Sequence, residues 1–287
     1  MNHSLEESYI PTNGIRLHVI RSGPVDGPPV ILLHGFPEFW RGWINQIEPL
    51  AQAGYRVIVP DQRGYNLSAV PPQVKSYRIS ELSKDIVGLM DSRDIKSCFL
   101  VGHDWGAAVA WNVALTFPQR VAKLGILNVP HPAVMMNFLK KNPRQMLKSW
   151  YIAFFKIPYL PDWLIKRKNF AVAIRSLQQS SRVGTFSASD ILEYQKAWRN
   201  SNGMTGMINW YRALLRFPTQ LPDDIHLHMP VRILWGKRDR FLSYQMAAAS
   251  AQLCDQVEVT LFENASHWVQ HEESLAVSQS LIQFFNQ

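Results

Sequence analysis

Hydrophobic and polar positions follow two alternating patterns over most of the chain. Short apolar runs, typical of buried strands in a parallel sheet, occur at 29–35, 55–61, 97–103, 123–129, 231–236 and 257–262. Between them apolar residues recur at steps of three and four, which predicts helices; one such series is Ile79, Leu82, Ile86 and Leu89. The chain is expected to begin with a hairpin, since Asn13-Gly14 separates two runs of alternating residues.

One long segment interrupts this alternation. From about 131 to 219 the sequence is aromatic, basic and rich in Pro, with a helical pattern and no convincing strand. The pattern therefore predicts an α/β fold with a doubly wound, mostly parallel sheet and an inserted helical cap. The expected segments are a first part of the core at 1–130, the cap at 131–219 and a second part of the core at 220–287.

Composition and charge are those of a globular protein with one unusual segment. The 287 residues are 47% hydrophobic and 18% charged, which suits a folded chain with one substantial core. Residues 131–188 hold ten Lys or Arg against one acid, Asp162, whereas the remainder is nearly balanced. The N-terminus is polar, no apolar run approaches a membrane span, and two cysteines form no disulfide framework. We therefore expect a cytoplasmic protein.

The stretch V-G-H-D-W-G, residues 101–106, contains the first candidate for chemistry. Asp104 stands where a glycine-flanked turn between a strand and a helix often carries a nucleophilic serine. Catalytic groups in such sheets lie at the carboxyl ends of strands, and Asp239 and His267 follow the last two predicted strands of the core, at 231–236 and 257–262. Either residue alone would be read as an ordinary loop side chain. Together with Asp104 they give the order nucleophile, acid, histidine and favour a catalytic set.

A carboxylate at this position favours a different reaction from that of a serine. With an ordinary pKa of about 3.9 it is ionised at neutral pH and needs no base. Its attack on an ester carbonyl would give an unstable anhydride, whereas attack on a saturated carbon gives a stable alkyl ester on Asp104. His267, oriented by Asp239, could then activate water for hydrolysis of that ester. The backbone N–H groups of Phe36 and Trp105 are expected to hold the resulting oxyanion.

Four motifs together resemble the α/β-hydrolase epoxide hydrolases: H-G-F-P-E-F-W (34–40), D-Q-R-G-Y-N-L-S (61–68), G-H-D-W-G (102–106) and N-W-Y-R (209–212). The resemblance covers nearly the whole chain and implies conversion of an epoxide to a vicinal diol, with no metal and no organic cofactor. Epoxide hydrolases of this family use two cap tyrosines, which the resemblance places at Tyr211 and, by a looser match, at Tyr151. A phenol with a pKa of about 10 is suited to protonating the alkoxide of an opening epoxide.

Two other functions remain open from the sequence. Dehalogenases acting on haloalkanes or haloacids share the H-G-x-P and G-x-D-x-G motifs and the same triad, and Trp105 could bind a halide. Against this, a departing halide needs no tyrosine, and the position after H-G that supplies a second halide donor in some dehalogenases is Phe36. A non-catalytic binding protein on the same fold is disfavoured because such proteins tend to lose triad members.

The expected ligands and partners follow from the same positions. Hydrophobic residues expected to line the substrate site, and so to favour apolar or aryl-substituted epoxides, are Phe36, Trp105, Phe154, Phe155 and Trp210. His226 and His228 form H-x-H without a third ligand at suitable spacing, so no metal site is predicted. No nucleic-acid-binding motif accompanies the basic segment. Its charge instead suggests weak association with anionic membranes. Glu38 could touch the site, but the sequence assigns it no role.

Overall fold

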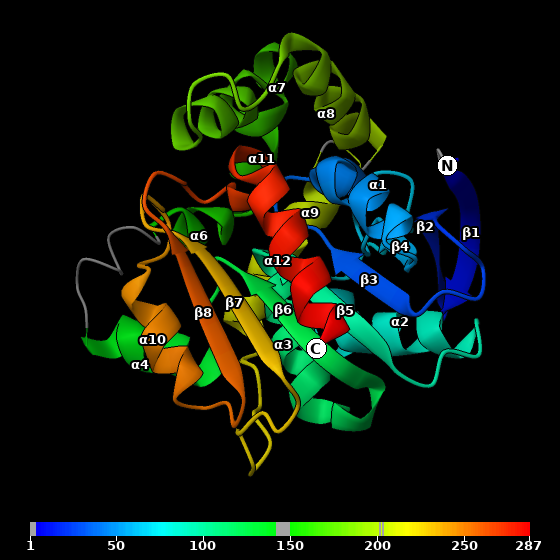
Figure 1. Cartoon of the computed structure of the whole chain (residues 1–287). Coiled ribbons are helices and arrows are strands. Elements are labelled where there is room, and N and C mark those ends of the chain that lie inside the picture. Colours follow the sequence, from blue (N-terminus) through cyan, green and yellow to red (C-terminus); the bar gives the residue numbers. More distant parts are fainter. Residues whose placement is uncertain (1–3, 142–149, 201, 203) are drawn as a thin grey trace.

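A computed structural model describes residues 4–141, 150–200, 202 and 204–287. At its centre lies an eight-stranded sheet with the strand order β1-β2-β4-β3-β5-β6-β7-β8 (Figure 1). The strands are β1 (Glu6–Thr12), β2 (Ile15–Ser22), β3 (Pro29–Leu33), β4 (Arg56–Pro60), β5 (Cys98–His103), β6 (Val121–Leu127), β7 (Val231–Gly236) and β8 (Val257–Phe262). This α/β architecture confirms the predicted fold class.

The first two strands form the predicted hairpin. β1 pairs with β2 and β2 with β4 in antiparallel orientation, whereas every later pairing, from β4–β3 to β7–β8, is parallel. Asn13 and Gly14 have φ of 41° and 73°, the positive values that a tight hairpin turn requires at both central positions. The sheet is therefore mostly parallel with an antiparallel edge.

Helices cover both faces of the sheet. Along β3, Val30 and Leu32 belong to a buried cluster with α1 (Ile44–Gln52) and α12 (Ser274–Asn286). Ile31 and Leu33 point the other way and belong to a cluster that includes α2 (Ile79–Asp91) and α3 (Trp105–Thr116). Burial on both faces explains why the central strands are continuous apolar runs. The remaining helices of the core are η1 (Trp40–Trp43), η2 (Val74–Tyr77), η3 (Pro118–Arg120), α10 (Gln245–Ala251) and α11 (Val269–Glu272).

Between β6 and β7 the chain leaves the sheet and forms a series of helices. They are α4 (Pro132–Lys141), α6 (Trp150–Phe155), α7 (Leu160–Ser180), α8 (Ala188–Asn200) and α9 (Thr205–Arg216). In Figure 1, α7 and α8 lie above the sheet, whereas α4 lies low beside α10. We keep the name cap for residues 131–219. Within α7 the backbone departs from helical geometry at residues 167–170, which divides the helix into two stretches. In the described part of the chain no helix combines the length and apolar character needed to cross a bilayer.

Candidate active site

Asp104 occupies a sharp turn between β5 and α3. Its φ of 50° and ψ of −123° lie outside the regions that non-glycine residues usually adopt. Small neighbours make the turn possible: a Cβ at Gly106 would lie 2.1 Å from the carbonyl oxygen of Leu33, and one at Gly35 would lie 2.3 Å from the Cβ of Asp104. The turn leaves the carboxylate accessible, with 17% of the side chain exposed. Strain of this kind is typical of functional positions.

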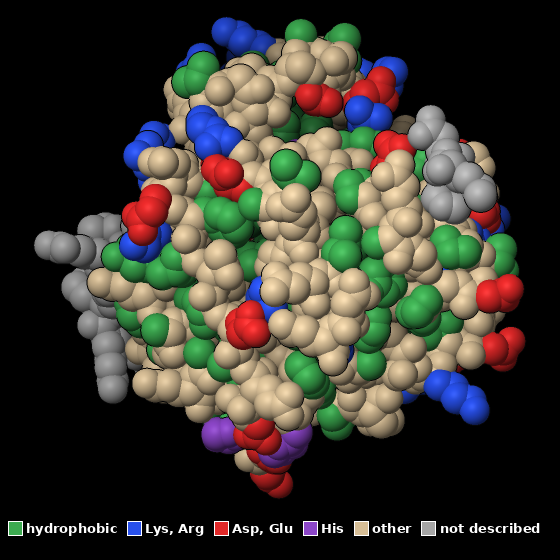
Figure 2. Space-filling view, viewed as in Figure 1, with side chains coloured by type: hydrophobic (Ala, Val, Ile, Leu, Met, Phe, Trp, Pro, Cys, Tyr) green, Lys and Arg blue, Asp and Glu red, His purple; other side chains and the backbone are tan. Residues whose placement is uncertain are grey.

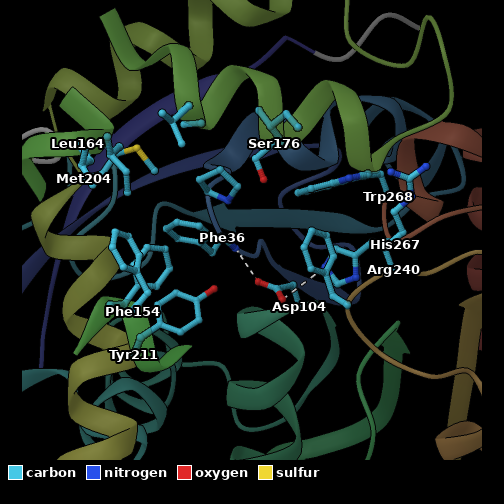
Figure 3. A pocket seen from close by; sticks show the side chains of 17 residues that line it. Phe36, Asp104, Phe154, Leu164, Ser176, Met204, Tyr211, Arg240, His267 and Trp268 are labelled. Atoms are coloured by element: carbon cyan, nitrogen blue, oxygen red, sulfur yellow. Dashed lines mark hydrogen bonds and ion pairs between the residues drawn. The ribbon is translucent and has the colours of Figure 1, made fainter. Parts of the chain in front are cut away.

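The two oxygens of the Asp104 carboxylate have different partners. The backbone N–H of Phe36 donates a hydrogen bond of 2.7 Å to Oδ1, while Nε2 of His267 lies 3.4 Å from Oδ2 (Figure 3). Burial would raise the pKa of Asp104, but the hydrogen bond and charge of His267 outweigh it and lower the pKa. Trp105 begins α3, where backbone N–H groups of the first turn have no partner within the helix. The carboxylate is thus ionised and has one oxygen directed at the histidine.

Asp239 is held rigidly behind His267. Its Oδ1 accepts hydrogen bonds from the backbone N–H groups of Phe241 (2.7 Å) and Leu242 (2.9 Å), and its Oδ2 accepts one from Nδ2 of Asn128 (2.8 Å). The same Oδ2 lies 2.8 Å from Nδ1 of His267. These bonds fix the carboxylate and, through it, the plane of the imidazole ring.

The charge state of His267 depends on both carboxylates. Burial alone would lower its pKa, yet the charges of Asp239 and Asp104 and their hydrogen bonds raise it to about 10. The resting imidazole is therefore a cation at neutral pH. Loss of the Asp104 charge would remove part of this stabilisation and make His267 a stronger acid.

A cavity of about 540 Å³ lies over Asp104, between the sheet and the cap. Asp104, His267, Phe36 and Tyr211 face it, and in Figure 3 the hydroxyl of Tyr211 points toward the Asp104 carboxylate. The rest of its wall is mainly apolar and includes Phe154, Phe155, Leu164, Ile165, Val172, Ala173, Leu177 and Met204. A second cavity of about 300 Å³ also reaches Asp104 and Tyr211. Both residues thus stand where the two cavities meet.

Aromatic side chains hold Tyr211 in place. Its ring contacts those of Phe36, Trp105 and Phe155, with centroids 5.2, 5.0 and 4.9 Å away. Of the five residues expected to line the substrate site, Phe36, Phe154 and Phe155 line the larger cavity, whereas Trp105 and Trp210 line the smaller one. Tyr151 belongs to helix α6, but its side chain lies outside the described residues.

Sequence reasoning left Glu38 without a role, although it is fully buried behind the site. Its carboxylate accepts hydrogen bonds from the side chains of Tyr194 in α8 (2.8 Å), Gln270 (3.0 Å) and His271 (2.7 Å). Burial would raise the pKa of Glu38, but the charge of His271 and bonds from His103 and His271 hold it well below its usual range. Nε2 of His103 in turn donates to the carbonyl oxygen of His267 (2.8 Å). In the sequence, the sign that Glu38 is buried and bonded is its position as a lone carboxylate among the apolar residues of H-G-F-P-E-F-W.

The histidines of the H-x-H motif lie apart from this cavity. His228 is exposed and bonded on both ring nitrogens, to Asp255 (2.6 Å) and Asp224 (3.0 Å). Within the described ranges no three His, Cys, Asp or Glu side chains are grouped so as to hold a metal ion.

The sheet order, the inserted cap and the turn at Asp104 define an α/β hydrolase, and comparison with known proteins agrees. The profile of the family described as alpha/beta hydrolase fold matches residues 28–274. Over 276 residues the chain is 43% identical to the AB hydrolase superfamily protein YfhM of Bacillus subtilis, covering 96% of both proteins. It is 34% identical to epoxide hydrolase 2 of Caenorhabditis elegans, covering 97% of this chain and 79% of that protein.

Two solved structures similar to this chain belong to one class of α/β hydrolases, the epoxide hydrolases. An epoxide hydrolase from Bacillus megaterium, crystallised with an inhibitor, matches with a TM-score of 0.90 at 32% identity, covering 98% of this chain and 100% of that chain. A variant of that enzyme has been solved with its product, a naphthyloxy-propanediol. The chain belongs to the epoxide hydrolases of the α/β-hydrolase family, as its four motifs predicted.

Proposed function

We propose that the protein hydrolyses an epoxide to a vicinal diol through a covalent alkyl ester on Asp104. The observation that carries the proposal is the convergence of three groups on one cavity: an ionised carboxylate, a histidine paired with Asp239, and the hydroxyl of Tyr211. Epoxide opening and ester hydrolysis need a nucleophile, a base and a proton donor. Each of these is present within the same space.

In the first step the carboxylate attacks a ring carbon. Because Oδ1 of Asp104 is held by the N–H of Phe36, Oδ2 is the oxygen that forms the new C–O bond. The bond between that carbon and the epoxide oxygen breaks, and the oxygen takes the phenolic proton of Tyr211. Tyr151 would be the second donor, as the family resemblance implies. The product is an alkyl ester with a neighbouring hydroxyl group.

In the second step water hydrolyses this ester. Esterification neutralises Asp104 and removes one of the charges that raise the pKa of His267. The imidazolium can then give up its proton, which through solvent restores the phenol of Tyr211, and the neutral imidazole acts as a base that takes a proton from water. Hydroxide attacks the ester carbonyl carbon, and the N–H groups of Phe36 and Trp105 hold the oxyanion, each donor being worth about 3 kcal/mol. Collapse of this intermediate breaks the bond between the carbonyl carbon and the alkyl oxygen, and the departing alkoxide takes the proton from His267 to give the diol. The new carboxyl group then passes its proton to His267, which restores the carboxylate and the imidazolium.

The side chains that line the larger cavity indicate which class of epoxide it would bind. Phe36, Phe154 and Phe155 give the larger cavity an aromatic lining, which favours apolar or aryl-substituted epoxides. The naphthyloxy-propanediol bound to the Bacillus megaterium variant is the product of such a substrate. We therefore propose aryl glycidyl ethers and styrene oxides as first substrates to assay.

Intact-protein mass spectrometry of His267→Gln tests the two-step scheme. The variant should react once with styrene oxide and gain the mass of one epoxide, mapped to the peptide that contains Asp104. Freshly prepared Asp104→Asn should gain none. Labelling of a different residue, or no labelling across a panel of epoxides, would reject the ester mechanism. Stable labelling by a haloalkane but not by an epoxide would assign the site to dehalogenation instead.

A further inference from the structure

The cap carries an exposed surface that the proposed chemistry does not use. We call it the basic aromatic patch; its members are Lys156, Ile157, Tyr159, Leu160, Trp163, Lys166, Arg167 and Lys168. All of them are exposed, Tyr159 by 86% and Trp163 by 54%. They lie in the connection between α6 and α7 and in the first part of α7. Figure 2 shows Lys and Arg side chains gathered on the cap beside hydrophobic ones.

The positive charge of this patch is not neutralised by neighbours. Among the ion pairs of the described residues, none joins a basic member of the patch to an acid. Asp162, the one acid of residues 131–188, is paired with Arg212 at 2.5 Å. The patch therefore presents four cations together with large apolar side chains.

The patch is also held in a defined conformation. Arg212, besides pairing with Asp162, donates hydrogen bonds to the carbonyl oxygens of Phe155 (3.1 Å) and Ile157 (3.3 Å), which ties down the connection before α7. The guanidinium of Arg167 lies 4.5 Å from the ring centroid of Trp163, a cation–π contact. Aromatic residues fixed in an exposed position, and rimmed by charge, are typical of an interaction surface.

We propose that the basic aromatic patch docks on an anionic lipid surface. A bilayer interface accepts both kinds of side chain, since Trp and Tyr favour the headgroup level and cations are attracted to anionic lipids. A second copy of the chain would bring like charges together. A nucleic acid would match the cations but would leave Ile157 and Leu160 against phosphates.

The position of the patch relative to the cavity gives this docking a consequence. Leu164 and Ile165, on the same helix as Trp163, line the larger cavity, and so does Val172, which is 55% exposed. The wall of the cavity thus includes residues from both stretches of α7, the helix whose first part carries the patch. If the proposed function holds, docking brings this wall close to the phase in which apolar epoxides dissolve.

Vesicle sedimentation at low ionic strength tests the docking without any turnover, so its outcome is independent of the proposed chemistry. The protein should bind vesicles of phosphatidylcholine with phosphatidylglycerol and not vesicles of phosphatidylcholine alone, and salt should weaken the binding. The double variant Lys166→Gln/Arg167→Gln should lower the partition coefficient between anionic vesicles and water about 25-fold. Adding Trp163→Ser to this double variant should lower the partition coefficient again. A matched control, Arg93→Gln/Lys96→Gln, removes the same charge from the exposed connection between α2 and β5 and should bind as wild type does.

Four results would overturn the proposal. Equal binding to neutral and anionic vesicles would show that charge plays no part, and absence of binding at low salt would leave the patch as a solvated face. Equal weakening by the control substitutions would show that net charge, and not this patch, is responsible. Capture of an oligonucleotide through the same residues, without vesicle binding, would assign the surface to nucleic acid. Circular dichroism confirms that each variant is folded.

Discussion

The raised pKa of His267 leads to a strong prediction about the pH dependence of stability. In the folded protein the pKa is about 10, against an ordinary value of 6.5 that applies to the unfolded chain. Below pH 6.5 the imidazole is protonated in both states, and the stabilisation is fully present. As the pH rises toward 10, only the folded protein keeps this proton, so the free energy of unfolding falls.

The magnitude follows from the size of the shift. Each pKa unit corresponds to about 1.4 kcal/mol, so between pH 6.5 and roughly pH 9.5 the imidazole should lose about 4 kcal/mol of stabilisation. His267→Gln cannot titrate there, whereas most other ionisable groups are shared by both proteins. The difference in unfolding free energy between wild type and variant should therefore change by about 4 kcal/mol over this range, in the sense that wild type loses its advantage.

Urea unfolding followed by tryptophan fluorescence at several pH values measures this difference directly. Asp104→Asn provides a control, because removal of one of the two carboxylates should lower the pKa of His267 and end the fall at a lower pH. A difference that stays constant between neutral and alkaline pH would refute the reasoning. The histidine would then not be a cation held between two carboxylates, and the proposed switch to a base on ester formation would fail.

Three further substitutions test other parts of the site. Tyr211→Phe should slow alkylation by styrene oxide in single-turnover experiments, while its circular dichroism spectrum stays unchanged; unaltered alkylation would exclude the tyrosine as proton donor. Gly106→Ala places a Cβ 2.1 Å from the Leu33 carbonyl oxygen. The free energy of unfolding, measured in urea, should fall by about 3 kcal/mol, and an unfolding curve identical to that of wild type would show that the turn can relax. Glu38→Gln replaces the carboxylate that Tyr194 and other buried donors face with an uncharged amide. The variant should unfold with a free energy lower by about 3 kcal/mol, and an unfolding free energy equal to that of wild type would show that the charge has no structural role.

Hydrophobic patterning located the core strands closely, and the differences have local causes. The apolar runs 231–236 and 257–262 coincide with β7 and β8. The strand predicted at 123–129 lies at 121–127 in the structure. It ends at Leu127 because Asn128 adopts a φ of 57° and donates a hydrogen bond to Asp239. The sequence around Asn128 contains no sign that this residue leaves the strand to bind a carboxylate more than a hundred positions away.

Chain order predicted which residues meet at the cavity, but not what supports them. Asp104, Asp239 and His267 follow three strands whose carboxyl ends share one edge of the sheet, so topology alone brings them together. The partners of Glu38 come instead from segments far apart in the chain, including the cap residue Tyr194. Contacts of this kind depend on how the cap sits on the core. Periodicity within a single segment contains no information about that placement.

The buried carboxylate of Glu38 means that the cap is not an interchangeable module. Exchanging it for the cap of another hydrolase, a natural route to new substrate preferences, would remove the hydroxyl of Tyr194 from an anion that has no access to solvent. The same anion is joined through His103 to the backbone of His267, so the damage would reach a side chain of the candidate site that the recipient core was meant to retain. A successful chimera therefore needs a hydroxyl at the matching position of the incoming helix.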